Sequence, residues 1–165
     1  MRIGVLSDSH DRMPTLAAAL ELFAAEKVEA VIHAGDFVAP FAMKRLVTFD
    51  GPVHAIFGNN DGERVGLSQI MPSLTPGPLR LELGGRRILV HHWIEQTPAE
   101  LIGQSDVVIT GHTHEVVNAR RDGRLILNPG ECCGWLTGRA TVAILDTEAL
   151  DARIVTLAQG RSWRP

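Results

Sequence analysis

The stretch Val5-Leu6-Ser7-Asp8-Ser9-His10-Asp11 near the start of the chain decides how the remaining sequence is interpreted. Residues 3–6 form a short apolar run, which predicts a buried strand that ends close to Asp8. Side chains two residues apart on an extended segment point to the same side, so Asp8 and His10 can be directed at one point in space. A carboxylate and an imidazole that converge at the carboxyl end of a strand are typical of one half of a divalent-metal site.

The length and composition of the chain indicate one ordinary folded domain, which we assign to residues 1–165. The sequence is 45% hydrophobic, and a domain of this size buries about 70% of the surface that its unfolded chain exposes. Such a domain needs no metal or disulfide merely to fold, so a metal would serve the function. The formal net charge of −3 gives no reason to expect nucleic acid as a partner.

The two cysteines, Cys132 and Cys133, are adjacent, which gives neither a disulfide framework nor the C-x-x-C spacing of a zinc site. This usage fits a reducing compartment, and the first apolar run is too short for a secretory signal. No apolar stretch approaches the length of a membrane span. We therefore expect a cytoplasmic protein that has no membrane partner.

The first sixty residues alternate between strand-like and helix-like patterns. This β-α-β-α-β order predicts a parallel sheet with right-handed crossovers. The expected strands are residues 3–6, 29–33 and 52–57, and the expected helices are residues 13–26 and 40–49.

The remainder of the chain predicts shorter elements and an antiparallel second half of the same α/β domain. Residues 62–78 are rich in Gly and Pro and show little periodicity, so we expect a loop with at most one helical turn. A hairpin is expected at residues 79–91, and a helix at residues 97–103 whose capping box is formed by Thr97 and Glu100. Further strands are expected at residues 106–110, 116–119, 125–127, 140–145 and 152–157.

Side chains that bind metals follow five of the predicted strands, at the end where open α/β sheets bind their ligands. They are Asp8 and His10, Asp36, Asn59, His91 or His92, and His112 with His114. Nitrogen and oxygen donors of this kind suit Mn, Fe, Ni, Zn or Co. Seven donors exceed the needs of one tetrahedral ion and suit two ions that share a carboxylate. Asp36 is the natural bridge, because Gly35 beside it permits a close approach.

Two metal ions about 3.5–4 Å apart can hold a hydroxide between them and stabilise an in-line displacement at phosphorus. The ordered motifs of the chain resemble those of the calcineurin-like metallophosphoesterases, and in particular their small bacterial and archaeal phosphodiesterase branch. The motifs are Asp8-Ser9-His10, Gly35-Asp36, Gly58-Asn59-Asn60-Asp61, His91 and Gly111-His112-Thr113-His114. The likeness to the small branch comes from Asn128-Pro129-Gly130-Glu131 and the tail Gly134-Trp135-Leu136-Thr137-Gly138-Arg139. The resemblance implies a four-layer α/β/β/α sandwich of two mixed sheets and a metal-dependent phosphodiesterase that uses a bridging hydroxide.

The resemblance also implies how the donors divide between two divalent ions, of which Mn is favoured and Ni, Fe, Co and Zn are alternatives. Asp8, His10 and His114 would hold the first ion, and Asn59, His91 and His112 the second, with Asp36 bridging. Neighbouring side chains on a strand face opposite ways, so one of His91 and His92 binds the metal. We favour His91, because it follows the apolar run most directly.

Asn60 departs from the family pattern, which usually has His at this position. We place Asn60 with Asp36 among the catalytic residues, because an amide can donate a hydrogen bond to a phosphate oxygen. An amide cannot transfer a proton, so the substitution favours substrates with good leaving groups.

The expected substrate is a small phosphodiester, and a homodimer is the assembly that the resemblance suggests. A phosphomonoesterase is the alternative activity, and a nuclease is disfavoured because the sequence lacks a basic groove with aromatic residues. A non-catalytic scaffold is the alternative from another class, because the chain also resembles the metallophosphoesterase-like subunit of the retromer coat, which acts mainly by binding partner proteins. The presence of His10, His112 and His114 favours the enzyme.

Overall fold

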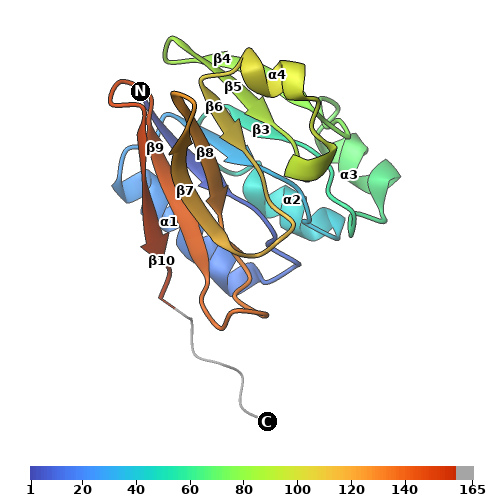
Figure 1. The fold of residues 1–165 in the computed structure, drawn as a ribbon. Coiled ribbons are helices and arrows are strands. Elements are labelled where there is room, and N and C mark those ends of the chain that lie inside the picture. The colour runs from blue at the N-terminus through green and yellow to red at the C-terminus, as the bar shows by residue number, and fades with distance from the viewer. Residues whose placement is uncertain (159–165) are drawn as a thin grey trace.

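The computed structural model describes residues 1–158, so the last seven residues of the predicted domain, 159–165, lie outside the described part. Two sheets of five strands each dominate the structure, and helices flank them (Figure 1). The helices are α1 (Met13–Ala25), α2 (Pro40–Leu46), α3 (Arg64–Ile70) and α4 (Ala99–Gly103), with a 3-10 turn, η1 (Ile94–Gln96). Among the described residues, no helix has the length and apolar character needed to cross a bilayer.

The first sheet has the strand order β10-β9-β1-β2-β3. Its strands are β1 (Arg2–Leu6), β2 (Ala30–His33), β3 (Val53–Ala55), β9 (Thr141–Asp146) and β10 (Asp151–Thr156). Strands β1, β2 and β3 are parallel, as the alternating pattern of the first sixty residues predicted, and β9 pairs antiparallel with β1. The N-terminal and C-terminal parts of the described chain thus form one sheet.

The second sheet has the order β4-β5-β6-β8-β7. Its strands are β4 (Leu79–Leu83), β5 (Arg86–Val90), β6 (Val107–Ile109), β7 (Val116–Arg121) and β8 (Arg124–Pro129). The pairs β5–β6 and β6–β8 are parallel, so the expected antiparallel second half is wrong for the centre of this sheet. The chain crosses over through α4 between β5 and β6, and this crossover restores the parallel direction.

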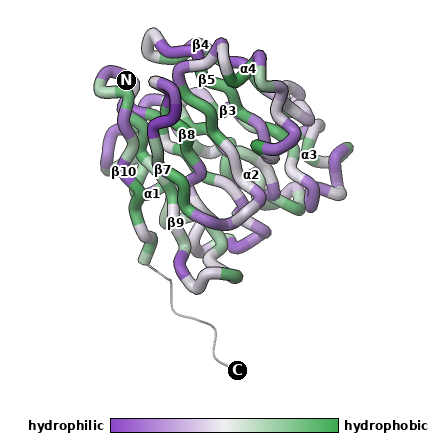
Figure 2. The backbone as a smooth tube through the Cα atoms, viewed as in Figure 1, coloured by the Kyte–Doolittle hydropathy of each residue, from purple (hydrophilic) through white to green (hydrophobic). Residues whose placement is uncertain are grey.

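Three apolar clusters separate four layers. One cluster lies between the first sheet and helices α1 to α3, a second joins the facing sides of the two sheets, and a third packs the second sheet against α4. Apolar residues accordingly follow the strands of both sheets, while the connections are mainly hydrophilic (Figure 2). The predicted α/β/β/α sandwich of two mixed sheets is confirmed.

Two local predictions are wrong. Residues 64–70 form helix α3 rather than a loop with a single turn, although only Leu67 of this helix is buried. The capping box is absent, because Pro98 precedes α4 and the Thr97 hydroxyl donates to the Trp93 carbonyl at 2.7 Å. Both segments lie on the surface, where a weak apolar pattern gives little information about the backbone.

Candidate metal centre

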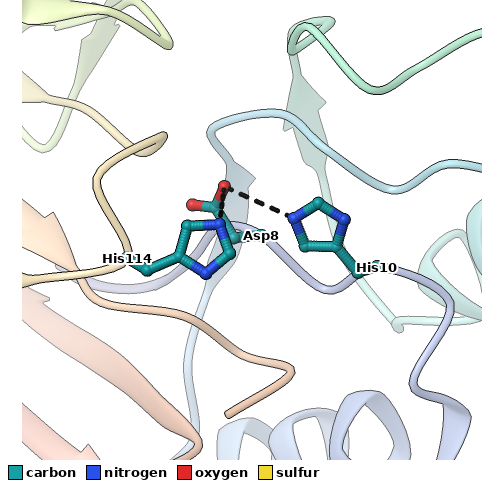
Figure 3. A group of neighbouring side chains, drawn as sticks. All are labelled: Asp8, His10 and His114. Carbon is teal, nitrogen blue, oxygen red and sulfur yellow. Dashed lines mark ion pairs between the residues drawn. The ribbon is translucent and has the colours of Figure 1, made fainter. Parts of the chain in front are cut away.

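The first group of candidate ligands consists of Asp8, His10 and His114, which point toward one another in Figure 3. Asp8 and His10 follow β1, and His114 follows β6, so the group joins the two sheets. The Asp8 Oδ1 atom lies 3.5 Å from His114 Nε2 and 3.9 Å from His10 Nε2. The sequence prediction that these residues converge agrees with this geometry.

The second group is arranged around Asp36, which follows β2. The Asp36 Oδ2 atom lies 3.6 Å from His10 Nε2 and 3.4 Å from His92 Nε2. The Asn59 side-chain oxygen lies 3.1 Å from His92 Nε2 and 2.9 Å from His112 Nδ1. Asp36 therefore stands between the two groups, at the place where the sequence predicted a shared carboxylate.

The structure places His92 in this group, and not His91, which the sequence analysis favoured. The His91 ring donates from Nδ1 to the Thr97 hydroxyl at 2.8 Å, on the side of the second sheet away from Asp36. The His92 ring donates from Nδ1 to the Ala34 carbonyl at 2.7 Å, which leaves its Nε2 atom for Asp36 and Asn59.

Strand alternation explains this correction. Val90 belongs to the apolar cluster between the sheets, and Leu89 belongs to the cluster beneath α4. His91 donates its backbone N–H to Ile109 at 3.0 Å, so the ladder continues beyond β5 and the alternation persists. His92 therefore shares the face of Val90, which is directed toward the first sheet.

Asn60 contacts Asp36 rather than open space. Its backbone N–H donates to Asp36 Oδ1 at 2.8 Å, and its side-chain amide donates to Asp36 Oδ2 at 2.7 Å. A β-carbon added to Gly58 would lie 2.1 Å from Asp36 Oδ1, so a glycine is required where this loop passes the carboxylate. The loop after β3 thus holds the Asp36 side chain in place.

Asp61 connects the loop after β2 to the loop after β3. It is buried, and its carboxylate accepts backbone N–H groups from Asp36 at 3.0 Å, Phe37 at 2.7 Å, Val38 at 2.8 Å and Gly58 at 2.7 Å. These contacts join the loops after β2 and β3. Asp61 therefore positions the backbone that carries Asp36 and does not face the site.

Glu131 is a site residue that the sequence reasoning missed. This buried carboxylate accepts from His114 Nδ1 at 2.8 Å and from the backbone N–H groups of Trp135, Leu136 and Thr137 at 2.9, 3.0 and 2.6 Å. Burial raises the pKa of Glu131, but the hydrogen bonds from Thr137 and His114 outweigh it and bring the pKa to about 2. Because Nδ1 of His114 donates to Glu131, the opposite ring atom, Nε2, is directed toward Asp8 and can bind the same metal ion as Asp8.

Several candidate ligands have a strained backbone. The φ angle is positive at five of them: Asp8 (52°), His10 (39°), Asp36 (63°), His112 (69°) and His114 (62°). Such a conformation costs roughly 1–2 kcal/mol for a residue with a side chain, although Asp and His are among the residues that tolerate it best. Strained residues of this kind cluster at functional sites, and here they direct the side chains of both groups inward.

Burial and neighbouring charges set the pKa values of the central groups. Burial raises the pKa of Asp8. Burial also raises the pKa of Asp36, but contacts with His92 and Asn60 outweigh it and hold the pKa well below its usual range. For His92, burial lowers the pKa and the adjacent Asp36 carboxylate more than reverses this effect, so the pKa is raised. The site thus favours positive charge next to Asp36.

The first group fits a divalent ion. Asp8 Oδ1 and His10 Nε2 are buried, and no described residue forms a hydrogen bond with them. Asp8 Oδ1 and His114 Nε2 lie 3.5 Å apart, close enough for both atoms to bind one cation. The donors are oxygen and nitrogen atoms, so the set suits Mn, Fe, Ni, Co or Zn.

The chain belongs to the calcineurin-like phosphoesterase superfamily, because the model of this family's domain matches residues 1–150. The prediction of a hydrolase that acts on phosphate ester bonds is therefore confirmed. A phosphodiesterase of Methanocaldococcus jannaschii is 41% identical over 165 residues, which cover 95% of this chain and 99% of the relative. The family uses divalent metals, in agreement with the donor set described above.

Solved structures support the fold assignment. An archaeal phosphodiesterase structure matches with a TM-score of 0.86 and 41% identity, and covers 95% of this chain and 100% of its own. A zinc complex of Vps29 from Entamoeba histolytica matches with a TM-score of 0.71 and 20% identity, over 97% of this chain and 94% of its own. The second likeness concerns the fold alone.

Proposed function

We propose that the chain is a phosphodiesterase that uses two divalent metal ions. Asp8, His10 and His114 would hold the first ion, and Asn59, His92 and His112 the second, with Asp36 shared between them. The observation that carries the proposal is the pair of buried atoms, Asp8 Oδ1 and His10 Nε2, that no described residue satisfies. The resemblance to a phosphodiesterase over nearly the whole chain supports the choice of a diester.

When bound, two divalent ions supply positive charge that polarises the phosphoryl oxygens and lowers the pKa of water, which makes a hydroxide available for in-line attack. The protein orients the ligands. Glu131 and the Ala34 carbonyl each accept the Nδ1 proton of a histidine, which fixes His114 and His92 with Nε2 directed inward. Asn60 holds both oxygens of Asp36.

A nucleophile from the protein is not needed in this proposal. The Ser7 hydroxyl is buried, and no described histidine forms a hydrogen bond with it that would activate it as a nucleophile. Asn60 cannot donate a proton to a leaving group, because an amide does not titrate in this range. We therefore propose substrates with good leaving groups, in the class of small phosphodiesters. Mn as the native metal, a cytoplasmic location and a homodimer remain predictions.

Hydrolysis with added metals tests this function. The protein would be stripped with a chelator and then supplied in turn with Mn, Ni, Co, Zn or Mg. Bis(p-nitrophenyl) phosphate serves as the diester and p-nitrophenyl phosphate as the monoester. We expect diester turnover only with metal, loss of turnover in Asp36→Asn, and normal turnover in the control Asp122→Asn, whose side chain is 92% exposed. Two bound ions without turnover of either ester would contradict the enzyme and favour a binding role.

A further inference from the structure

Two adjacent residues in the segment that Glu131 holds next to the candidate metal centre have large, exposed apolar side chains. Trp135 is 62% exposed and Leu136 is 76% exposed, and they are adjacent in the sequence. Apolar groups that are exposed together next to a polar site are typical of a surface that binds a ligand. The function of the metal ligands does not account for them.

The segment that carries these two side chains is held firmly. The Glu131 carboxylate accepts the backbone N–H groups of both Trp135 and Leu136, and it also accepts the Thr137 hydroxyl at 2.7 Å. The guanidinium of Arg12 donates to the Cys133 carbonyl just before this segment. The exposure of the two side chains is therefore a property of an anchored segment, and Glu131 fixes that segment relative to His114.

The Trp135 ring continues a row of rings that starts at the first group of ligands. His10 stacks on His114 with centroids 5.2 Å apart and an interplanar angle of 28°. Trp135 lies next to His10, with centroids 6.2 Å apart and an interplanar angle of 27°. The indole ring is thus nearly parallel to the His10 ring and stands beside the first group of candidate ligands.

A second tryptophan borders the second group. Trp93 lies 5.4 Å from the His112 ring and 5.2 Å from the His92 ring, between centroids. Each half of the site therefore has an aromatic side chain beside it. This arrangement suits a phosphate with an organic group on each side, which is the definition of a diester.

We propose that Trp135 and Leu136 form a wall that binds a planar aromatic ester group of the phosphodiester substrate. This inference rests on the function proposed above and adds the chemical class of the substrate. An aromatic group stacked on the indole gains contact area and favourable ring geometry, and Leu136 extends the apolar surface beside it. We expect the wall to contribute about tenfold to the affinity for an aromatic ligand over a methyl ligand.

Calorimetry with two phosphonates tests the wall without requiring turnover. Phenylphosphonate and methylphosphonate carry the same anionic group and differ only in the organic group. Their dissociation constants would be measured for the Mn-loaded protein and for Trp135→Ala and Trp135→Phe. Val65→Ala is the control, because Val65 is 75% exposed and lies on α3.

We expect about tenfold tighter binding of phenylphosphonate than of methylphosphonate in the unchanged protein and in Val65→Ala. The ratio should fall to near one in Trp135→Ala and be largely retained in Trp135→Phe. Two results would contradict the proposed aromatic-binding role of Trp135 and Leu136: equal affinity for the two phosphonates in the unchanged protein, or a preference for phenylphosphonate that persists in Trp135→Ala. Neither result would contradict the phosphodiesterase proposal. Failure of both phosphonates to bind the Mn-loaded protein would overturn both proposals.

Discussion

The Nδ1 atom of His114 lies 2.8 Å from Oε2 of Glu131, a buried carboxylate that belongs to the segment after β8. The same carboxylate accepts the backbone N–H groups of Trp135, Leu136 and Thr137. One side chain thereby connects a candidate metal ligand to the segment that we propose as a substrate wall. Removal of its charge should disturb both.

Glu131→Gln is predicted to weaken metal binding. The glutamine amide presents N–H groups to a site where N–H groups already converge, so several of them lose their acceptor. Outer partners of metal-binding histidines typically contribute 10–100-fold to affinity, and we expect a loss of about this size for Mn in calorimetry. Thr137→Ala is the control, because it removes one hydroxyl contact with Glu131 and leaves His114 untouched. Unchanged Mn affinity in Glu131→Gln would show that the contact does not orient His114.

His92→Ala and His91→Ala are predicted to differ in the number of ions bound. His92 faces Asp36 and Asn59, so its removal should reduce two bound Mn ions per chain to one. His91 contacts Thr97 instead, and its removal should leave both ions in place. Elemental analysis after gel filtration in excess Mn gives the count. Loss of an ion in His91→Ala alone would restore the assignment that the sequence favoured.

The two adjacent histidines also show which part of the site the sequence alone can predict. Alternation alone establishes that His91 and His92 face opposite ways. It does not identify the inner face, because β5 has apolar residues on both sides: Val90 packs between the sheets and Leu89 packs beneath α4. A strand with one polar face would have settled the choice.

The other parts of the fold and the site differ in how clearly the sequence predicts them, and each difference has a physical reason. The fold and the convergence of Asp8, His10 and Asp36 could be predicted, because buried parallel strands leave a clear apolar pattern and their ends share one edge. Glu131 was quoted from the sequence only as part of a motif. Its role could not be predicted, because most of its partners are backbone N–H groups, which carry no sequence signature. Helix α3 was missed because a single buried residue, Leu67, gives no helical periodicity.

Asp61→Ala is predicted to lower the free energy of unfolding by roughly 3–5 kcal/mol, because losses of this size are typical when a buried hydrogen-bond network is broken. Four backbone N–H groups that now donate to the carboxylate would lose their acceptor. Urea unfolding of the metal-free protein measures the change without a contribution from bound ions. Asp11→Ala is the matched control. Among the described residues, the Asp11 carboxylate accepts only the Ala39 N–H, so this substitution should cost about 1 kcal/mol. Equal losses in the two variants would contradict the positioning role of Asp61.

The ion pair between Arg87 and Asp106 is predicted to make a small contribution to stability that depends on pH. Hydrogen bonds from the Arg87 side chain and backbone lower the pKa of Asp106 from 3.8 to about 2. As the pH falls, the unfolded chain therefore takes up a proton at this position before the folded protein does. The contribution is complete above about pH 4 and is lost as the pH falls toward 2.

Asp106→Asn should accordingly lower the free energy of unfolding slightly at pH 7, and the difference from the unchanged protein should shrink between pH 4 and pH 2. The effect stays small because the Arg87 side chain is 58% exposed and salt screens the pair, so it should also decrease in 1 M NaCl. Urea unfolding at several pH values provides the measurement. Asp122→Asn is the control, because the Asp122 side chain is 92% exposed and its pair with Arg124 is long, at 3.9 Å. A difference for Asp106→Asn that grows as the pH falls below 4 would mean that the carboxylate is not stabilised in its charged form by Arg87.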